Sequence, residues 1–98
     1  DCSMTAATVL DDATAAIIRR ALSAAQAGRL EEACAAGQDG LQSGGEPGAL
    51  HALLGMLRAR QNDLSRALQH LREAHRMRPQ DPSVAINLAS ALAQEGLY

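Results

Sequence analysis

The chain repeats itself with a period of 34 residues. Residues of similar size or turn-forming chemistry recur at this spacing in four series, which are Gly28, Asn62 and Gly96; Leu30, Leu64 and Tyr98; Ala21, Gly55 and Ala89; and Ala33 and Ala67. This period is typical of helix-turn-helix units that stack because none of them can bury its apolar face alone. The repeat therefore predicts an all-α fold of stacked antiparallel helical hairpins, built to hold a partner.

Turn and capping residues predict where the helices begin and end. Gly28 and Gly96 are expected in the left-handed conformation just past helix ends, and Asp63 is expected as an N-cap. Asp81 is a further N-cap, followed by Pro82 in the first helical turn. The expected helices, five in number and without strands, cover about 12–27, 30–42, 48–61, 64–77 and 82–95.

Gly55 lies inside one of these predicted helices. A glycine in a helix interior costs roughly 1 kcal/mol relative to alanine, so a packing reason is expected. We predict that Gly55 faces Ala67 and Ala74 and lets two antiparallel helices approach closely.

The middle repeat resembles the tetratricopeptide family. The resemblance rests on the spacing of the pattern His51-x2-Leu54-Gly55-x2-Arg58, Ala67-x3-Leu71-x2-Ala74 and Pro79. In this pattern His51, Arg58 and Leu71 stand where the family has Trp, Tyr and Phe. The resemblance implies a short right-handed α-solenoid of about five helices. It also divides the chain into an N-terminal tail and helix cap over 1–13 and a repeat domain over 14–98, with repeats at about 14–47 and 48–81 and a partial repeat at 82–98.

The resemblance also implies a binding surface, because this family usually holds ligands on a concave face lined by the first helix of each repeat. When the family's positions are carried over to this chain, they predict a peptide-binding groove that also contains small residues such as Ala59. Its predicted residues are Ile18, Leu22, Gln26, Ala52, Leu53, Met56, Arg60, Ile86, Asn87, Ser90 and Gln94. Asn87 matches an asparagine that holds the peptide backbone in other members. Members that clamp acidic chaperone tails have Lys, Arg and Asn where this chain has Ile18, Leu22 and Leu53, which argues against that ligand.

Titratable residues are not arranged for catalysis or for metal binding. His70 and His75 lie about 140° apart around a helix, so they cannot share a metal ion as an i, i+4 pair would. His51 falls on another predicted helix, and Cys34 is expected to be a small buried hydrophobe. We therefore expect no enzymatic activity, no cofactor and no bound metal.

Charge is distributed unevenly along the chain. The net charge is −4 over residues 1–47 and +2 over residues 48–98, where the arginines are Arg58, Arg60, Arg66, Arg72, Arg76 and Arg78. Nucleic-acid binding is disfavoured, because no aromatic residue is interleaved for stacking and the whole chain is negative. Lysine is absent, which indicates a bacterial coding background, and the lack of a membrane span or secretory signal predicts a cytoplasmic protein.

The last predicted helix carries an apolar ridge with no partner helix after it, formed by Val84, Leu88, Ala91 and Leu92. A terminal helix of a repeat array normally turns a polar face to water. We therefore expect either further repeats or a further domain, or a weak homodimer through this ridge. Three functional classes remain open: a non-catalytic scaffold for a protein or peptide, the helical front region of a larger bacterial enzyme of sulfotransferase or glycosyltransferase type, and a structural self-association unit.

Overall fold

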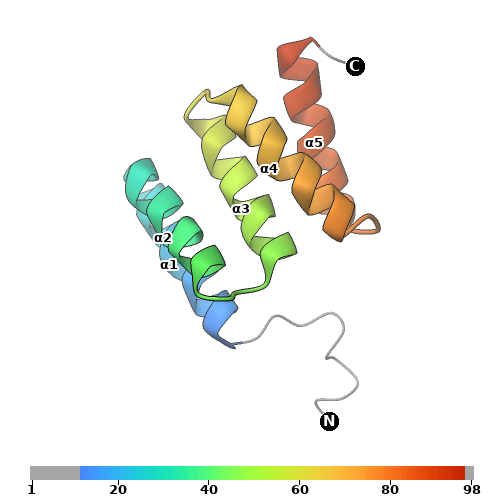
Figure 1. Ribbon diagram of the computed structural model, residues 1–98. Coiled ribbons are helices and arrows are strands. Elements are labelled where there is room, and N and C mark those ends of the chain that lie inside the picture. The colour runs from blue at the N-terminus through green and yellow to red at the C-terminus, as the bar shows by residue number, and fades with distance from the viewer. Residues whose placement is uncertain (1–11, 97–98) are drawn as a thin grey trace.

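Five α-helices joined by short turns make up the computed structural model, which describes residues 12–96 (Figure 1). Every predicted helix is present, with each end within one residue of its expected position. The described residues contain no strand, so the all-α prediction is confirmed. Residues 1–11 of the predicted tail and Tyr98 lie outside the described part of the chain. The helices are α1 (Asp12–Gln26), α2 (Leu30–Gln42), α3 (Pro47–Arg60), α4 (Leu64–Met77) and α5 (Pro82–Glu95).

The first of the 34-residue series marks the same backbone turn in each repeat. Gly28, Asn62 and Gly96 have φ angles of +85°, +62° and +77°. Asparagine is one of the few residues with a side chain that enter this left-handed region readily. The predicted turn chemistry is therefore confirmed, and it places a sharp reversal after α1 and after α3 and a left-handed residue at the end of α5.

Side-chain caps start the later helices. The Asp63 carboxylate accepts a hydrogen bond from the Arg66 backbone N–H at 3.2 Å, as predicted. The Asp81 carboxylate accepts from the Ser83 N–H at 3.0 Å and from the Ser83 hydroxyl at 2.8 Å, and this hydroxyl is the main cause that lowers the pKa of Asp81. The sequence analysis missed Glu46, which caps α3 by accepting from the Ala49 N–H at 3.0 Å.

The helices pack in the order of the chain. Each helix contacts the next one, and on one side of the array the first helices of successive hairpins also touch, α1 with α3 and α3 with α5. This arrangement is that of a helical-repeat solenoid (Figure 1). No helix over residues 12–96 is both long and apolar enough to cross a bilayer, while the cytoplasmic location stays a prediction.

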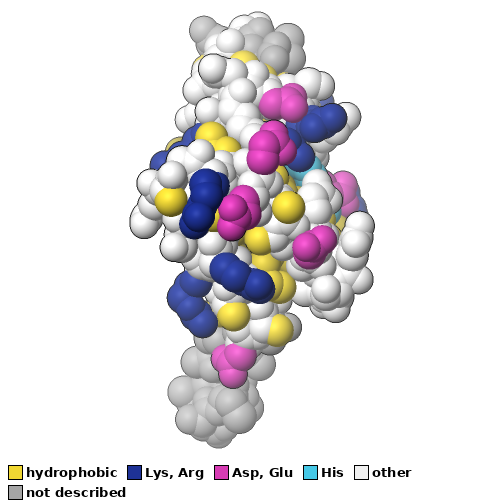
Figure 2. Space-filling view, turned by 90° about the vertical axis from the view of Figure 1, so that its left-hand side faces the viewer, with side chains coloured by type: hydrophobic (Ala, Val, Ile, Leu, Met, Phe, Trp, Pro, Cys, Tyr) yellow, Lys and Arg dark blue, Asp and Glu magenta, His cyan; other side chains and the backbone are white. Residues whose placement is uncertain are grey.

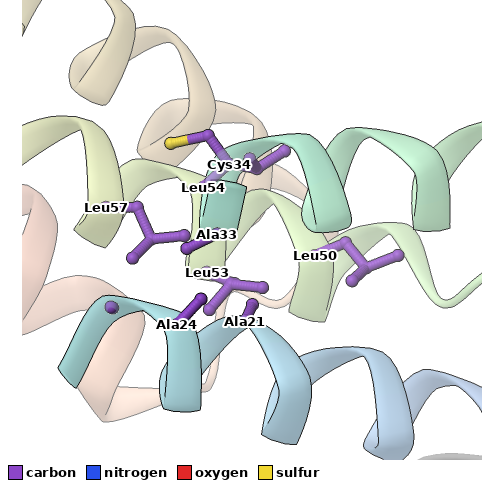
Figure 3. Packing of buried hydrophobic residues seen from close by; sticks show 9 residues of the cluster. Ala21, Ala24, Ala33, Cys34, Leu50, Leu53, Leu54 and Leu57 are labelled. Atoms are coloured by element: carbon purple, nitrogen blue, oxygen red, sulfur yellow. The ribbon is translucent and has the colours of Figure 1, made fainter. Parts of the chain in front are cut away.

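The main core combines small residues on α1 and α2 with leucines on α3 (Figure 3). Alanines in the first two helices leave room for longer side chains, so the burial of leucine supplies most of the apolar contact. Leu53 belongs to this core and is only 6% exposed, so its predicted place in the groove was wrong. The buried members of the cluster are Ala21, Ala24, Ala25, Ala33, Cys34, Leu50, Leu53, Leu54 and Leu57.

Gly55 allows α3 and α4 to approach closely, as predicted, and Leu71 is its nearest neighbour. A Cβ atom at this position would lie 2.5 Å from Leu71 Cγ and 3.3 Å from the Ala67 carbonyl oxygen. The close contact is therefore with the Leu71 side chain and with the backbone of Ala67, one of the two residues that Gly55 was predicted to face. Between α2 and α3 the glycine lies on the earlier helix, because Gly37 on α2 makes room for Leu54 on α3.

The apolar ridge of α5 is partly covered within the chain, because Val84 and Ala91 are buried and Leu88 and Leu92 are half-buried. Val84 and Ala91 are 1% and 2% exposed, and Leu88 and Leu92 pack against a cluster that α5 shares with Leu68 and Leu71 of α4. The expectation that these four residues form an open ridge was therefore wrong. The preceding helix α4 supplies a partner for this ridge, while Leu88 and Leu92 stay half-buried, and the homodimer stays a prediction.

Candidate binding groove

A pocket lies between α3 and α5 on the side where these two helices touch, with one residue from α4. Its volume is about 230 Å³. Sites for whole cofactors and drug-sized ligands measure about 300–1,000 Å³, so this one is of a size for a side chain of a polypeptide. We call it the α3–α5 pocket, and its lining residues are Met56, Ala59, Arg60, Leu71, Asn87, Ser90, Ala91 and Gln94.

The apolar and polar residues of the α3–α5 pocket lie at different depths. Leu71 and Ala91 are almost fully buried, while Arg60, Ser90 and Gln94 are exposed. Met56, Ala59 and Asn87 are half-buried and lie between these two levels. The pocket therefore combines an apolar floor with a rim of hydrogen-bonding side chains, a combination typical of sites that orient a mostly apolar ligand group.

Helical periodicity explains why these side chains converge. On α3 the lining residues follow the i, i+3, i+4 pattern of a single helix face, and on α5 they follow i, i+3, i+4, i+7. Leu71 joins them from α4 because Gly55 lets α4 pack closely against α3. The α3–α5 pocket thus depends on the same close contact that holds the second hairpin together.

The predicted groove divides into residues that meet here and residues that do not. Met56, Arg60, Asn87, Ser90 and Gln94 all line the α3–α5 pocket. Leu71 and Ala91 were missed, Leu71 because it belongs to a second helix and Ala91 because it was assigned to the ridge of α5. Among the predicted residues outside the pocket, Ile18 and Ala52 are half-buried, Gln26 is exposed, and Leu22 and Ile86 are exposed apolar residues at 36% and 64%.

Arg60 is the one charged residue among those that line the α3–α5 pocket. It makes no ion pair or hydrogen bond with another side chain of the described region. It also lies in the last turn of α3, where a positive charge interacts favourably with the helix dipole. Its guanidinium is therefore available to a ligand.

Most of the other arginines after residue 48 have partners within the chain. Arg58 donates to Gln61 at 3.0 Å, Arg66 pairs with Asp63 at 3.6 Å, Arg76 pairs with Glu73, and Arg78 pairs with Glu46 and Asp81, each at 3.6 Å. These arginines serve turns and helix ends, which does not favour a continuous basic face for nucleic acid. Charges of both signs are also interspersed on the side of the molecule that Figure 2 shows.

Two histidines that the sequence analysis kept apart meet between α3 and α4. The Nδ1 atoms of His51 and His70 are 3.0 Å apart, and the ring centroids are 5.2 Å apart. Burial, followed by the nearby His51, Arg58 and Arg66, lowers the pKa of His70. A neutral pair can share one proton in a hydrogen bond, whereas two charged rings would repel each other.

Cys34, the thiol that the sequence analysis expected to be buried, lies in the main core. Cys34 is 1% exposed, its Sγ lies 3.8 Å from Gln61 Oε1, and burial raises the pKa of its thiol. A thiol with a raised pKa is a poor nucleophile at neutral pH. Residues 12–96 contain no group of three or more His, Cys, Asp or Glu side chains placed to hold a metal ion.

These features define a helical-repeat scaffold with a pocket between the first helices of successive hairpins. Residues 47–91 match the family model of the tetratricopeptide repeat, which supports assigning this stretch of the chain to that family. The matched stretch runs from the start of α3 into α5 and contains all the lining residues of the α3–α5 pocket except Gln94. Searches of the curated proteins and of the solved structures found no match to the chain.

Proposed function

We propose that this chain is a non-catalytic scaffold that binds a polypeptide segment in the α3–α5 pocket. The observation that carries the proposal is the apolar floor of the pocket beneath a rim of polar side chains. The residues of this pocket come from α3, α4 and α5, and most of them lie in the stretch that matches the tetratricopeptide model. Tetratricopeptide repeats generally mediate protein–protein interactions, which supports a polypeptide as the ligand. The alternative of a self-association unit rested on the ridge of α5, which packs against α4.

The amide side chains of the pocket suit an extended peptide. Asn87 and Gln94 each carry both a donor and an acceptor, the pair of groups that a peptide backbone offers in return. They are seven residues apart on α5, a distance along the helix of about 10.5 Å. An extended chain covers this distance in about three residues, at about 3.3 Å for each. One side chain between two such contacts can then point down to Leu71 and Ala91.

The test compares two variants on neighbouring positions of α5. A displayed library of short random peptides is selected on the parent chain, and the selected peptides are then measured against Ser90→Trp and Ala89→Trp. Both positions are exposed, but only Ser90 lines the α3–α5 pocket, so a tryptophan at 90 fills it without disturbing the core. We expect Ser90→Trp to lose the peptides and Ala89→Trp to keep them, with equal helix content by circular dichroism. Peptides that bind both variants equally well would place the binding site elsewhere.

A further inference from the structure

We infer that the α3–α5 pocket selects segments in which an aliphatic side chain stands next to an acidic one, with Arg60 as the residue that determines this specificity. The inference rests on the proposed function, since it names the chemistry of the ligand of that same pocket. It follows from the depth at which the apolar residues lie and from the single charge on the rim.

The floor of the pocket accepts an apolar group. Leu71, Ala91 and the half-buried Met56 offer no hydrogen-bonding side chain to whatever enters most deeply. A polar group placed there would lose its hydration without gaining a partner, which costs free energy, while an aliphatic group gains by leaving water. The volume of about 230 Å³ lies below the range of sites for whole cofactors and suits a single side chain.

The rim of the pocket then favours one charge on the ligand residue that stands next to the buried aliphatic one. Asn87, Ser90 and Gln94 are neutral, so Arg60 alone sets the sign of the electrostatic potential among the described residues of the lining. An acidic side chain next to the buried one can pair with the guanidinium, whereas a basic side chain would be repelled. Arg60 does not have to give up an ion pair of its own to make this contact.

A second pocket on the first hairpin shows the contrast. It has a similar volume of about 240 Å³ and alanines at Ala24, Ala35 and Ala36, but its charged residues are of both signs: Arg20, Glu32 and Asp39. One positive and two negative charges leave this lining with a net charge of −1, so that pocket has no reason to prefer an acidic ligand. The preference is therefore specific to the α3–α5 pocket, where the arginine has no acidic neighbour in the lining.

The acidic group is a side chain within a continuing segment. Asn87 and Gln94 lie on either side of Ser90 and Ala91 along α5, so backbone contacts can form both before and after the buried side chain. A free chain end could use only one of these two contacts. It would also meet a single cation, whereas a terminal carboxylate needs several donors to be held in one position.

The experiment uses synthetic peptides with acetylated and amidated ends, which therefore carry no terminal charge. The first peptide has leucine flanked by aspartates, the second has leucine flanked by asparagines, and the third has alanine flanked by aspartates. A fourth is the asparagine peptide with a free carboxyl end. Binding to the isotope-labelled chain is followed by NMR, through the side-chain amide signals of Asn87 and Gln94.

We expect the aspartate–leucine peptide to bind about twofold to fivefold more tightly than the asparagine–leucine peptide, which is the range for an exposed ion pair. Added salt should reduce this ratio. Arg60→Gln should abolish it, while the control Arg72→Gln should preserve it, because Arg72 is also an exposed arginine but lies outside the pocket. The alanine peptide should bind more weakly than its leucine counterpart.

The outcomes separate this inference from the proposed function. If the aspartate and asparagine peptides shift the same amide signals with equal affinity, the pocket is confirmed as a binding site and the acidic preference is refuted. If the peptide with the free carboxyl end binds most tightly, the assignment to an internal side chain is overturned. If no peptide shifts the signals of Asn87 or Gln94, both the inference and the proposed function fail.

Discussion

The contact between Gly55 and Leu71 makes the packing of α3 against α4 open to a sharp test. In Gly55→Ala the new Cβ atom would lie 2.5 Å from Leu71 Cγ and 2.7 Å from Leu71 Cδ2, so the leucine must move. Overpacking of this kind costs about 1–3 kcal/mol, and the better helix propensity of alanine offsets about 1 kcal/mol of it. We therefore expect a net loss of about 1 kcal/mol, up to about 2 kcal/mol, in the free energy of unfolding.

The sign of this effect should reverse when the leucine is removed. Leu71→Ala alone should cost about 2–5 kcal/mol, because Leu71 is 1% exposed and its loss leaves a cavity. In that background Gly55→Ala has room for its methyl group on the side of residue 71, so the gain in helix propensity of about 1 kcal/mol should dominate. Only the Ala67 carbonyl oxygen, 3.3 Å from the new carbon, remains close.

Urea unfolding of the parent, both single variants and the double variant supplies the four free energies of a double-mutant cycle. A change at position 55 that has the same sign and size in both backgrounds would refute this account of the contact. Since Leu71 also forms the floor of the α3–α5 pocket, Gly55→Ala should in addition weaken the binding of the aspartate–leucine peptide.

Three further predictions concern the histidines and a helix cap. Because the pKa of His70 is lowered in the folded chain, the folded state favours the neutral ring, and stability should fall as pH drops from about 6.5 through the lowered pKa. Urea midpoints measured at several pH values should depend less on pH in His70→Gln than in the parent, whereas His75→Gln should keep the dependence of the parent. An unchanged dependence in His70→Gln would contradict the role of the pair. Asp63→Ala should lower the free energy of unfolding by about 1 kcal/mol, since it removes the N-cap of α4, and Asp63→Asn should restore most of it by the same urea measurement; equal losses in both variants would assign the effect to charge. Elemental analysis of the purified chain should find no stoichiometric metal, and one tightly held zinc or nickel ion per chain would overturn our view of His51 and His70.

The sequence by itself determined the helices and turns of this protein. Signals such as Asp63, Asp81 and Pro82 act on the backbone within a few residues, so their effect does not depend on how the helices later pack. Gly28 and Gly96 were predicted as left-handed residues for the same local reason, and the structure adds Asn62 at the same repeat position. Five of the predicted groove residues, Met56, Arg60, Asn87, Ser90 and Gln94, line the α3–α5 pocket, and their role in binding stays a prediction.

Only the tertiary structure decided which neighbour each helix face meets. Helical periodicity tells which residues share a face, but the covering helix depends on how closely and at what angle two helices pack. The ridge of α5 is therefore covered by Leu68 and Leu71 of α4, and Leu53 enters the core while Met56, nearly one turn further along the same helix, reaches the pocket. The meeting of His51 and His70 has the same origin, because residues 19 positions apart are brought together only when α3 and α4 pack against each other.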